Sequence, residues 1–212
     1  NLLVSEHIQY KPAAQFEGIH YPGPRIQLAG DRTTAAVTLA VRDVVHEPNP
    51  LLVRDHEIAI RSATGMLEVT ESLVIENPLS KTYVGAPPDD QEADPVTLQL
   101  SIPTDFQKVT FHQESFGRSF AIRGGKLATS IPWEPGRRAL KFTYFLRNTS
   151  QQRLWERTLD LPTDGLRVRV ATSAPDDVTG NLDRQATTPC AGDWEVLFTS
   201  GSTPLPAQYV VR

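Results

Sequence analysis

The chain has 212 residues but only one cysteine and no long apolar segment. The lone Cys190 excludes an internal disulfide, and its surroundings, TTPCAGDW, lack the spacing of a metal or haem-attachment motif. No apolar run approaches the roughly 18 residues that a membrane-spanning helix requires. We interpret Cys190 as a buried, inert thiol, and a free thiol or a contact between chains is the alternative.

The chain also lacks concentrated positive charge. Its net charge is −4, from 25 acidic and 21 basic residues, and the Lys and Arg residues form no run. Proteins that bind nucleic acid usually present a basic patch or stripe to the phosphate backbone. The sequence therefore argues against nucleic acid as a partner, while its hydrophobic fraction of 39% is ordinary for a globular protein.

Catalytic and metal-binding motifs are missing as well. The sequence has no G-x-S-x-G elbow, no H-E-x-x-H helix motif and no phosphate-binding loop. No two of its histidines stand at metal-ligand spacing on one element, although distant residues of a β-sandwich can still converge. The five are His7, His20, His46, His56 and His112. We therefore assign no catalytic residue, no metal ligand and no cofactor.

Helical periodicity is scarce, whereas a period-two alternation of apolar and polar side chains recurs along the chain. An apolar side chain at every second position is typical of antiparallel strands that cover a core on one face. Trp194 alternates with Val196 and Phe198, so we expect its ring in the core. The alternating segments are 37–41, 57–61, 96–102, 140–146, 166–170 and 194–198.

Turn residues separate these segments. Gly124-Gly125 predicts a two-residue hairpin turn with positive φ at both positions, and Pro135-Gly136 predicts a type II turn. The 17 prolines fall mostly between strand-like segments. This spacing of strands and turns predicts an all-β fold, an antiparallel β-sandwich of immunoglobulin-like or related Greek-key architecture.

The domain organisation is expected to have two parts. Residues 1–32 contain two prolines and two glycines in close succession, and we interpret them as the end of a preceding β-domain plus an extended linker. Residues 33–212 are predicted to form the sandwich. The first ten residues, NLLVSEHIQY, lack the pattern of a signal peptide, so we expect a piece of a longer protein.

Residues 86–95, APPDDQEADP, form a polar and acidic insertion. Their carboxylates could bind Ca²⁺ loosely, but the calcium-loop spacing with its glycine and distal glutamate is absent. A solvated loop is therefore the favoured interpretation. The acidic residues are Asp89, Asp90, Glu92 and Asp94.

The stretch MLEVTESLVIENPLSKTYVG, residues 66–85, contains one carboxylate on its apolar face. Leu67, Val69, Leu73 and Ile75 define that face, and Glu71 shares it. An unpaired buried carboxylate costs several kcal/mol, so Glu71 must pair with a partner such as arginine, reach the rim, or sit at a bulge. On a functional interpretation, the Glu71 side chain points into a cleft, where burial would raise the pKa of its carboxyl group.

Four motifs resemble a family of exported bacterial proteins, in which a carboxypeptidase regulatory-like domain precedes a poorly characterised β-rich domain. The motifs are VIENPLSKTYVG, LQLSIPTDF, EPGRRALKFTYFL and LDLPTDGLRVRV. The resemblance covers most of residues 8–172 and brings no catalytic residue with it. It implies an exported sandwich that is periplasmic, on the cell surface or extracellular. Because it implies a bacterial source, it argues against glycosylation at the Asn148 sequon.

We therefore expect a non-catalytic structural or interaction module whose partners are other envelope proteins or glycans. The alternative is a carbohydrate-binding module, in which tryptophan and tyrosine rings form a stacking platform, although such rings more often pack in a core. Trp133, beside the Pro135-Gly136 turn, is the best candidate for an exposed ring. The candidate ligand-binding residues are Trp133, Tyr83 and Glu71. An enzyme that combines Glu71 with a distant histidine or aspartate is the third and weakest hypothesis.

Overall fold

The computed structural model describes residues 2–63, 65–86, 94–112, 119–148, 155–200 and 208–211. These residues are almost entirely strand and loop, and the one helical element among them is the short 3₁₀ helix η1 (Pro175–Asp177). The predicted all-β fold is confirmed.

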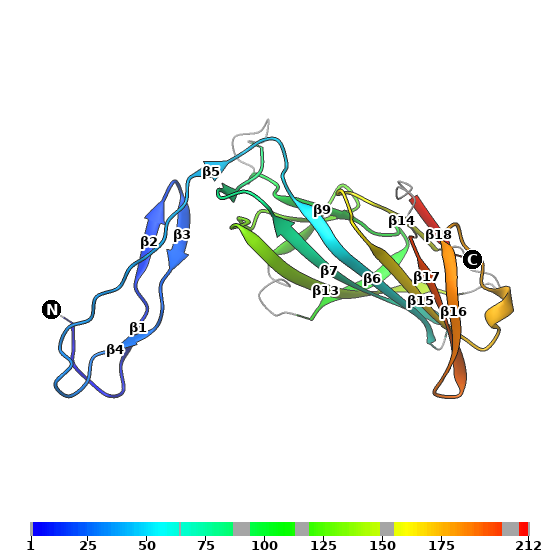
Figure 1. The fold of residues 1–212 in the computed structure, drawn as a ribbon, viewed down its shortest axis with the longest axis horizontal. Coiled ribbons are helices and arrows are strands. Elements are labelled where there is room, and N and C mark those ends of the chain that lie inside the picture. The colour runs from blue at the N-terminus through cyan, green and yellow to red at the C-terminus, as the bar shows by residue number, and fades with distance from the viewer. Residues whose placement is uncertain are drawn as a thin grey trace.

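One layer of the sandwich is a seven-stranded sheet (Figure 1). Apolar and polar residues alternate in its long central strands, so each strand directs buried and less buried side chains to opposite faces. In spatial order the strands are β10 (Phe106–Phe111), β13 (Gly136–Arg147), β7 (Met66–Asn77), β6 (Leu52–Ala63), β15 (Leu166–Thr172), β17 (Asp193–Thr199) and β16 (Asp183–Cys190).

The seven-stranded sheet is mixed, because β6 and β15 run parallel while the other neighbours are antiparallel. The expected antiparallel β-sandwich is observed, and β6–β15 is the one parallel pair among the described strands of this sheet. Period-two alternation reports only that one face of a strand is covered, and it does not encode the direction of the neighbouring strand. That direction depends on connections between segments distant in the chain.

The second layer consists of shorter strands. β11 (Phe120–Arg123), β12 (Lys126–Thr129) and β9 (Leu98–Ser101) form a three-stranded sheet, and β14 (Trp155–Thr158) pairs with β18 (Gln208–Val211). Gly124 and Gly125 join β11 to β12 with φ of 56° and 76°, which confirms the predicted hairpin turn. Gly136 has φ of 100°, as the third position of a type II turn needs, and begins β13.

The core lies between the two layers. Inward side chains of the large sheet, such as Ile58, Val69 and Phe142, pack with Leu98 and Leu127 of the second layer, and all five are at most 2% exposed. The outer face of the large sheet is polar and has cross-strand ion pairs, including Arg167–Asp55 and Arg61–Glu68. The expected covering of one face only is therefore confirmed.

A set of short strands lies beyond one end of the sandwich (Figure 1). β1 (Gln9–Tyr10) pairs with β4 (Ile26–Gln27), and β2 (Ala13–Phe16) pairs with β3 (Ile19–Pro22). The tie to the sandwich is β5 (Val44–Val45), which runs parallel to β8 (Thr82–Tyr83). That residues 1–32 end a preceding domain stays a prediction.

Residues 37–41 are not a strand, contrary to expectation. Their alternation has another cause: the segment runs in extended form past the β2–β3 hairpin. Contact is so close that a side chain on Gly23 would meet Leu39 at 2.5 Å. Packing on a hairpin can produce the same pattern as pairing in a sheet.

Two side chains near the β16–β17 turn also differ from expectation. Cys190 is exposed rather than buried, and the Trp194 ring is 41% exposed, although Val196 and Phe198 on the same strand are in the core. Cys190 and Trp194 flank the turn that joins the two strands, and Ala191 and Gly192 there have positive φ. The hairpin end extends past the part of the sheet that the core covers.

Candidate functional site

The most concentrated polar chemistry in the described residues surrounds Glu71. Its carboxylate is 0% exposed and accepts hydrogen bonds from three side chains. Arg157 Nε lies 3.1 Å from both carboxylate oxygens, Tyr144 Oη lies 3.0 Å from Oε1, and His56 Nε2 lies 3.0 Å from Oε2. Glu71 therefore has an arginine partner, as one sequence interpretation expected, and it is not a rim residue.

Strand register explains why these side chains meet. Ile58 of β6 and Phe142 of β13 stand opposite Glu71 of β7, so His56 and Tyr144 occupy diagonal positions on the same inward face. Diagonal neighbours in a sheet lie within reach of long and aromatic side chains. Arg157 reaches Glu71 from β14 in the other layer. The cluster thus ties the two layers together.

The hydrogen bonds continue outward from Arg157 to the surface. Arg157 Nη1 donates to Asp160 at 3.1 Å, and Asp160 also accepts from the backbone N–H and hydroxyl of Ser101 at 2.7 and 2.6 Å. Lys126 Nζ lies 3.2 Å from Asp160, and its side chain is 44% exposed. We name the members the Glu71 network: His56, Glu71, Ser101, Lys126, Tyr144, Trp155, Arg157 and Asp160. Trp155 belongs because its Nε1 donates to Tyr144 Oη at 2.9 Å.

Electrostatics holds the two carboxylates of this network in the ionised form. Burial raises the pKa of Glu71, but the charge of Arg157 and the hydrogen bonds from His56 and Tyr144 outweigh it, so this pKa lies below its ordinary 4.5. Burial likewise raises the pKa of Asp160, and hydrogen bonds from Ser101 and the charge of Arg157 bring it below 3.8.

Arg157 and Tyr144 are held in the forms that complement these carboxylates. Burial lowers the pKa of Arg157, but Glu71, Tyr144 and Asp160 together raise it more, so the guanidinium stays protonated. Burial and the same carboxylate raise the pKa of Tyr144 well above 10.0, which keeps its hydroxyl a donor. The cluster is therefore a closed set of paired charges at neutral pH. A general acid requires a raised carboxyl pKa, and Glu71 has the opposite shift.

One atom of the network is left without a partner among the described residues. His56 is 1% exposed and presents Nε2 to the ionised Glu71, so Nε2 carries the proton. Its Nδ1 is buried and has no hydrogen-bond partner.

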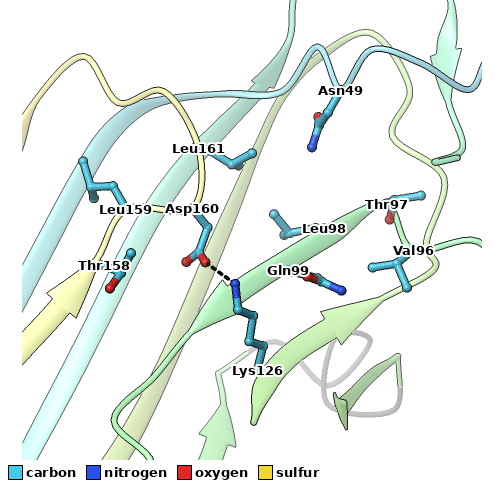
Figure 2. Close-up of a pocket in the computed structure, with 10 residues that line it drawn as sticks. All are labelled: Asn49, Val96, Thr97, Leu98, Gln99, Lys126, Thr158, Leu159, Asp160 and Leu161. Atoms are coloured by element: carbon cyan, nitrogen blue, oxygen red, sulfur yellow. Dashed lines mark hydrogen bonds and ion pairs between the residues drawn. The ribbon is translucent and has the colours of Figure 1, made fainter. Parts of the chain in front are cut away.

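A pocket of about 490 Å³ opens where the network reaches the surface (Figure 2). Figure 2 shows Asp160 and Lys126 meeting on one side of it, with Leu98 and Gln99 on β9 and Leu161 across from them. Asn49, Val96, Thr97, Thr158 and Leu159 complete the lining. This pocket is the accessible end of an otherwise sealed cluster.

The aromatic candidates occupy a different part of the molecule. Trp133 is 0% exposed and Tyr83 is 4% exposed, and their backbones exchange two hydrogen bonds of 2.9 Å each. Arg138 stacks over the Trp133 ring at 5.2 Å from its centroid. The expectation that Trp133 presents an exposed ring is wrong, because this ring packs in the core with Tyr83. The side-chain hydrogen bonds of Glu71 go to His56, Tyr144 and Arg157, and none of those described goes to Trp133 or Tyr83.

Sequence reasoning identified Glu71 but missed Arg157, Asp160 and Tyr144. The signal that singled out Glu71 was a charged residue on an apolar face. Trp155 and Arg157 alternate in the same way in WERT, so the same rule could have found Arg157. Asp160 lies in a loop, where no periodicity exists to mark it.

Metal and modification sites were also considered. No group of three His, Cys, Asp or Glu residues that could hold a metal ion exists within the described residues. Asp89, Asp90 and Glu92 of the acidic loop lie outside those residues, as does part of the Asn148 sequon. No helix in the described part is both long enough and apolar enough to cross a membrane.

Comparison with known proteins yields limited likeness. No protein-family model matches the chain, and no curated protein matches its sequence. Among solved structures, a two-domain M1 zinc metallopeptidase bound to L-tryptophan has a TM-score of 0.45 at 13% identity, over 77% of this chain and 43% of that one. An M1 zinc metallopeptidase from Deinococcus radiodurans has a TM-score of 0.43 at 14% identity, over 77% and 42%. The chain spans less than half the length of these proteins, and similarity this low assigns neither family nor function.

Proposed function

We propose that this chain is a non-catalytic β-sandwich module that serves a structural or interaction role in an exported bacterial envelope protein. The observation that carries the proposal is the burial of Glu71, whose carboxylate is fully enclosed and saturated by Arg157, His56 and Tyr144. A substrate cannot reach a carboxylate in this position without opening the core. Glu71 therefore joins the two layers instead of acting on a ligand.

The envelope assignment rests on a separate basis, the resemblance of four turn-and-strand motifs to exported bacterial proteins. It is tested by fractionating cells that express the protein from its natural gene. Recovery with periplasmic, outer-membrane or medium fractions is expected. Recovery with cytoplasmic markers would contradict export while leaving the non-catalytic proposal intact.

The non-catalytic proposal is tested by a turnover screen. The purified chain and its Glu71→Gln variant are incubated with fluorogenic ester, phosphate, glycoside and aminoacyl-amide substrates. We expect no turnover by the wild-type chain above that of the variant. Turnover that disappears in a folded Glu71→Gln protein, as judged by circular dichroism, would overturn the proposal and favour the enzyme hypothesis.

The carbohydrate-binding alternative is addressed in the same preparation. Trp133 and Tyr83 are enclosed, so an exposed-ring platform would have to use another aromatic residue, of which Trp194 is 41% exposed. Glycan-array binding that is lost in Trp194→Ala would favour the alternative. If no glycan binds, interaction with a protein partner remains the proposed function.

A further inference from the structure

The second layer of the sandwich is interrupted beside β9. Among the described residues, β9 pairs with β12 on one side and with no strand on the other. The segment on the far side of the gap, Thr158–Leu161, begins at the last residue of β14, whose strand partner is β18. The pocket of about 490 Å³ occupies this gap (Figure 2). A strand edge therefore borders a cavity.

The free edge of β9 offers backbone groups to that cavity. The Ser101 N–H points away from β12 and donates to Asp160. Backbone groups of successive residues in a strand point to opposite sides, so the N–H and C=O of Gln99 point to the same free edge as those of Ser101. Asp160 caps one end of the edge, and the described residues give the backbone of Gln99 no partner on this side. The edge is about four residues long, or roughly 13 Å.

The side chains of the pocket favour an amphipathic, negatively charged occupant. The partly buried Leu159 and Leu161 supply apolar surface. The Asp160 carboxylate is 7% exposed and is saturated by Ser101, Arg157 and Lys126, whereas Lys126 is 44% exposed. The charge presented to solvent at the pocket mouth is consequently positive.

We propose that this pocket binds a short extended peptide of a partner protein, which adds a strand to the free edge of β9. Backbone hydrogen bonds to Gln99 supply affinity, apolar side chains contact Leu159 and Leu161, and an acidic side chain pairs with Lys126. The inference deepens the proposed interaction role and rests on it. The added strand completes the second layer of the sandwich.

The test uses an array of acetylated, fluorescein-labelled hexapeptides in which apolar and acidic residues alternate, together with a matched array that carries lysine in place of the acidic residues. Binding to the whole chain is measured by fluorescence anisotropy. Acidic peptides are expected to bind at least tenfold more tightly than their lysine counterparts. Absence of binding across the acidic array, or equal binding of both arrays, would overturn the inference.

Gln99→Pro is the decisive variant. Proline removes the N–H that faces the pocket, and edge strands tolerate it because the bonds to β12 come from the neighbouring residues. Gln99→Ala is the control, since it removes the side chain and keeps the N–H. We expect Gln99→Pro to weaken peptide binding at least tenfold and Gln99→Ala to change it less than threefold. Equal effects of the two variants would exclude backbone pairing.

Lys126→Gln provides a second readout that does not depend on proline being accommodated. It is expected to abolish the preference for acidic over lysine peptides while leaving the melting temperature within a few degrees of the wild-type value. An unchanged preference would contradict the charge assignment. The outcome is distinct from failure of the proposed function, which is detected as Glu71-dependent turnover.

Discussion

At the scale of single residues, substitution of one member of the Glu71–Arg157 pair is expected to cause a large loss of stability. Both side chains are at most 2% exposed and meet across the two layers. Removing one partner of a buried ion pair leaves an uncompensated charge and typically costs about 3–5 kcal/mol. Replacing both partners by neutral groups costs less, because no charge remains enclosed.

We predict that Glu71→Gln lowers the free energy of unfolding by about 3 kcal/mol, since Arg157 then retains only Asp160 as a carboxylate partner. Urea denaturation measures the change. The double variant Glu71→Gln/Arg157→Gln is the control and is expected to be more stable than the single variant. If the single variant is as stable as the wild type, the Glu71–Arg157 pair does not contribute to the stability of the fold.

Acid stability depends on the same carboxylates. The pKa values of Glu71 and Asp160 in the folded chain lie below their ordinary 4.5 and 3.8. A depressed folded pKa contributes stability that is fully present above the ordinary value and is lost as the pH falls towards the folded value. We therefore predict a melting temperature that is steady near pH 6 and falls below about pH 4.5. In Asp160→Asn the fall should be shallower, and an identical slope would contradict the assignment.

At the scale of elements, one glycine is required both by its backbone angle and by its surroundings. Gly85 follows β8 with φ of 79°, and a side chain there would meet the carbonyl oxygen of Val96 at 2.4 Å. Gly125, in the turn between β11 and β12, has a similar φ of 76° but nothing within 4 Å. A comparison of substitutions at the two positions therefore separates the energetic cost of backbone strain from the cost of steric conflict.

We predict that Gly125→Ala lowers the free energy of unfolding by about 1–2 kcal/mol through strain alone. Gly85→Ala should cost at least about 1 kcal/mol more, because a backbone atom cannot move aside as a flexible side chain can. Chemical denaturation of both variants provides the comparison. Equal losses would mean that the Val96 backbone shifts freely to admit the methyl group.

At the scale of the whole molecule, Tyr21 joins the N-terminal strands to the sandwich. Its ring is 4% exposed, and its hydroxyl lies 2.9 Å from the Arg42 carbonyl and 3.1 Å from the Thr82 hydroxyl, which is itself buried. A second tie is Glu17, whose carboxylate accepts the Val44 N–H at 2.8 Å. These contacts connect β2–β3 to β5 and β8.

We predict that Tyr21→Phe accelerates amide exchange roughly tenfold across residues 13–22 and 44–45, since each lost hydrogen bond is worth about 0.5–1.5 kcal/mol. Hydrogen exchange with mass spectrometry measures the effect. Tyr10→Phe is the control, because the Tyr10 hydroxyl donates only to Leu3 within the N-terminal strands. Acceleration of the same residues by Tyr10→Phe would show that the coupling is not specific to Tyr21.

Much of the fold was accessible from local sequence. The alternation in residues 57–61, 96–102, 140–146 and 166–170 correctly marked strands, because the covered face of a strand needs an apolar side chain at every second position. The β11–β12 turn could also be predicted from its glycine pair, since positive φ at both positions favours glycine. The acidic residue on an apolar face correctly indicated that Glu71 needs a partner.

The partners of Glu71 could be identified only from the folded structure. Arg157 lies 86 positions from Glu71, and no periodicity links a strand in one layer to a strand in the other. The parallel pairing of β6 and β15, the exposure of Trp194 and the pocket beside β9 have the same origin. Each depends on where a segment ends relative to neighbours distant in sequence, and only the packing of the two layers sets that relation.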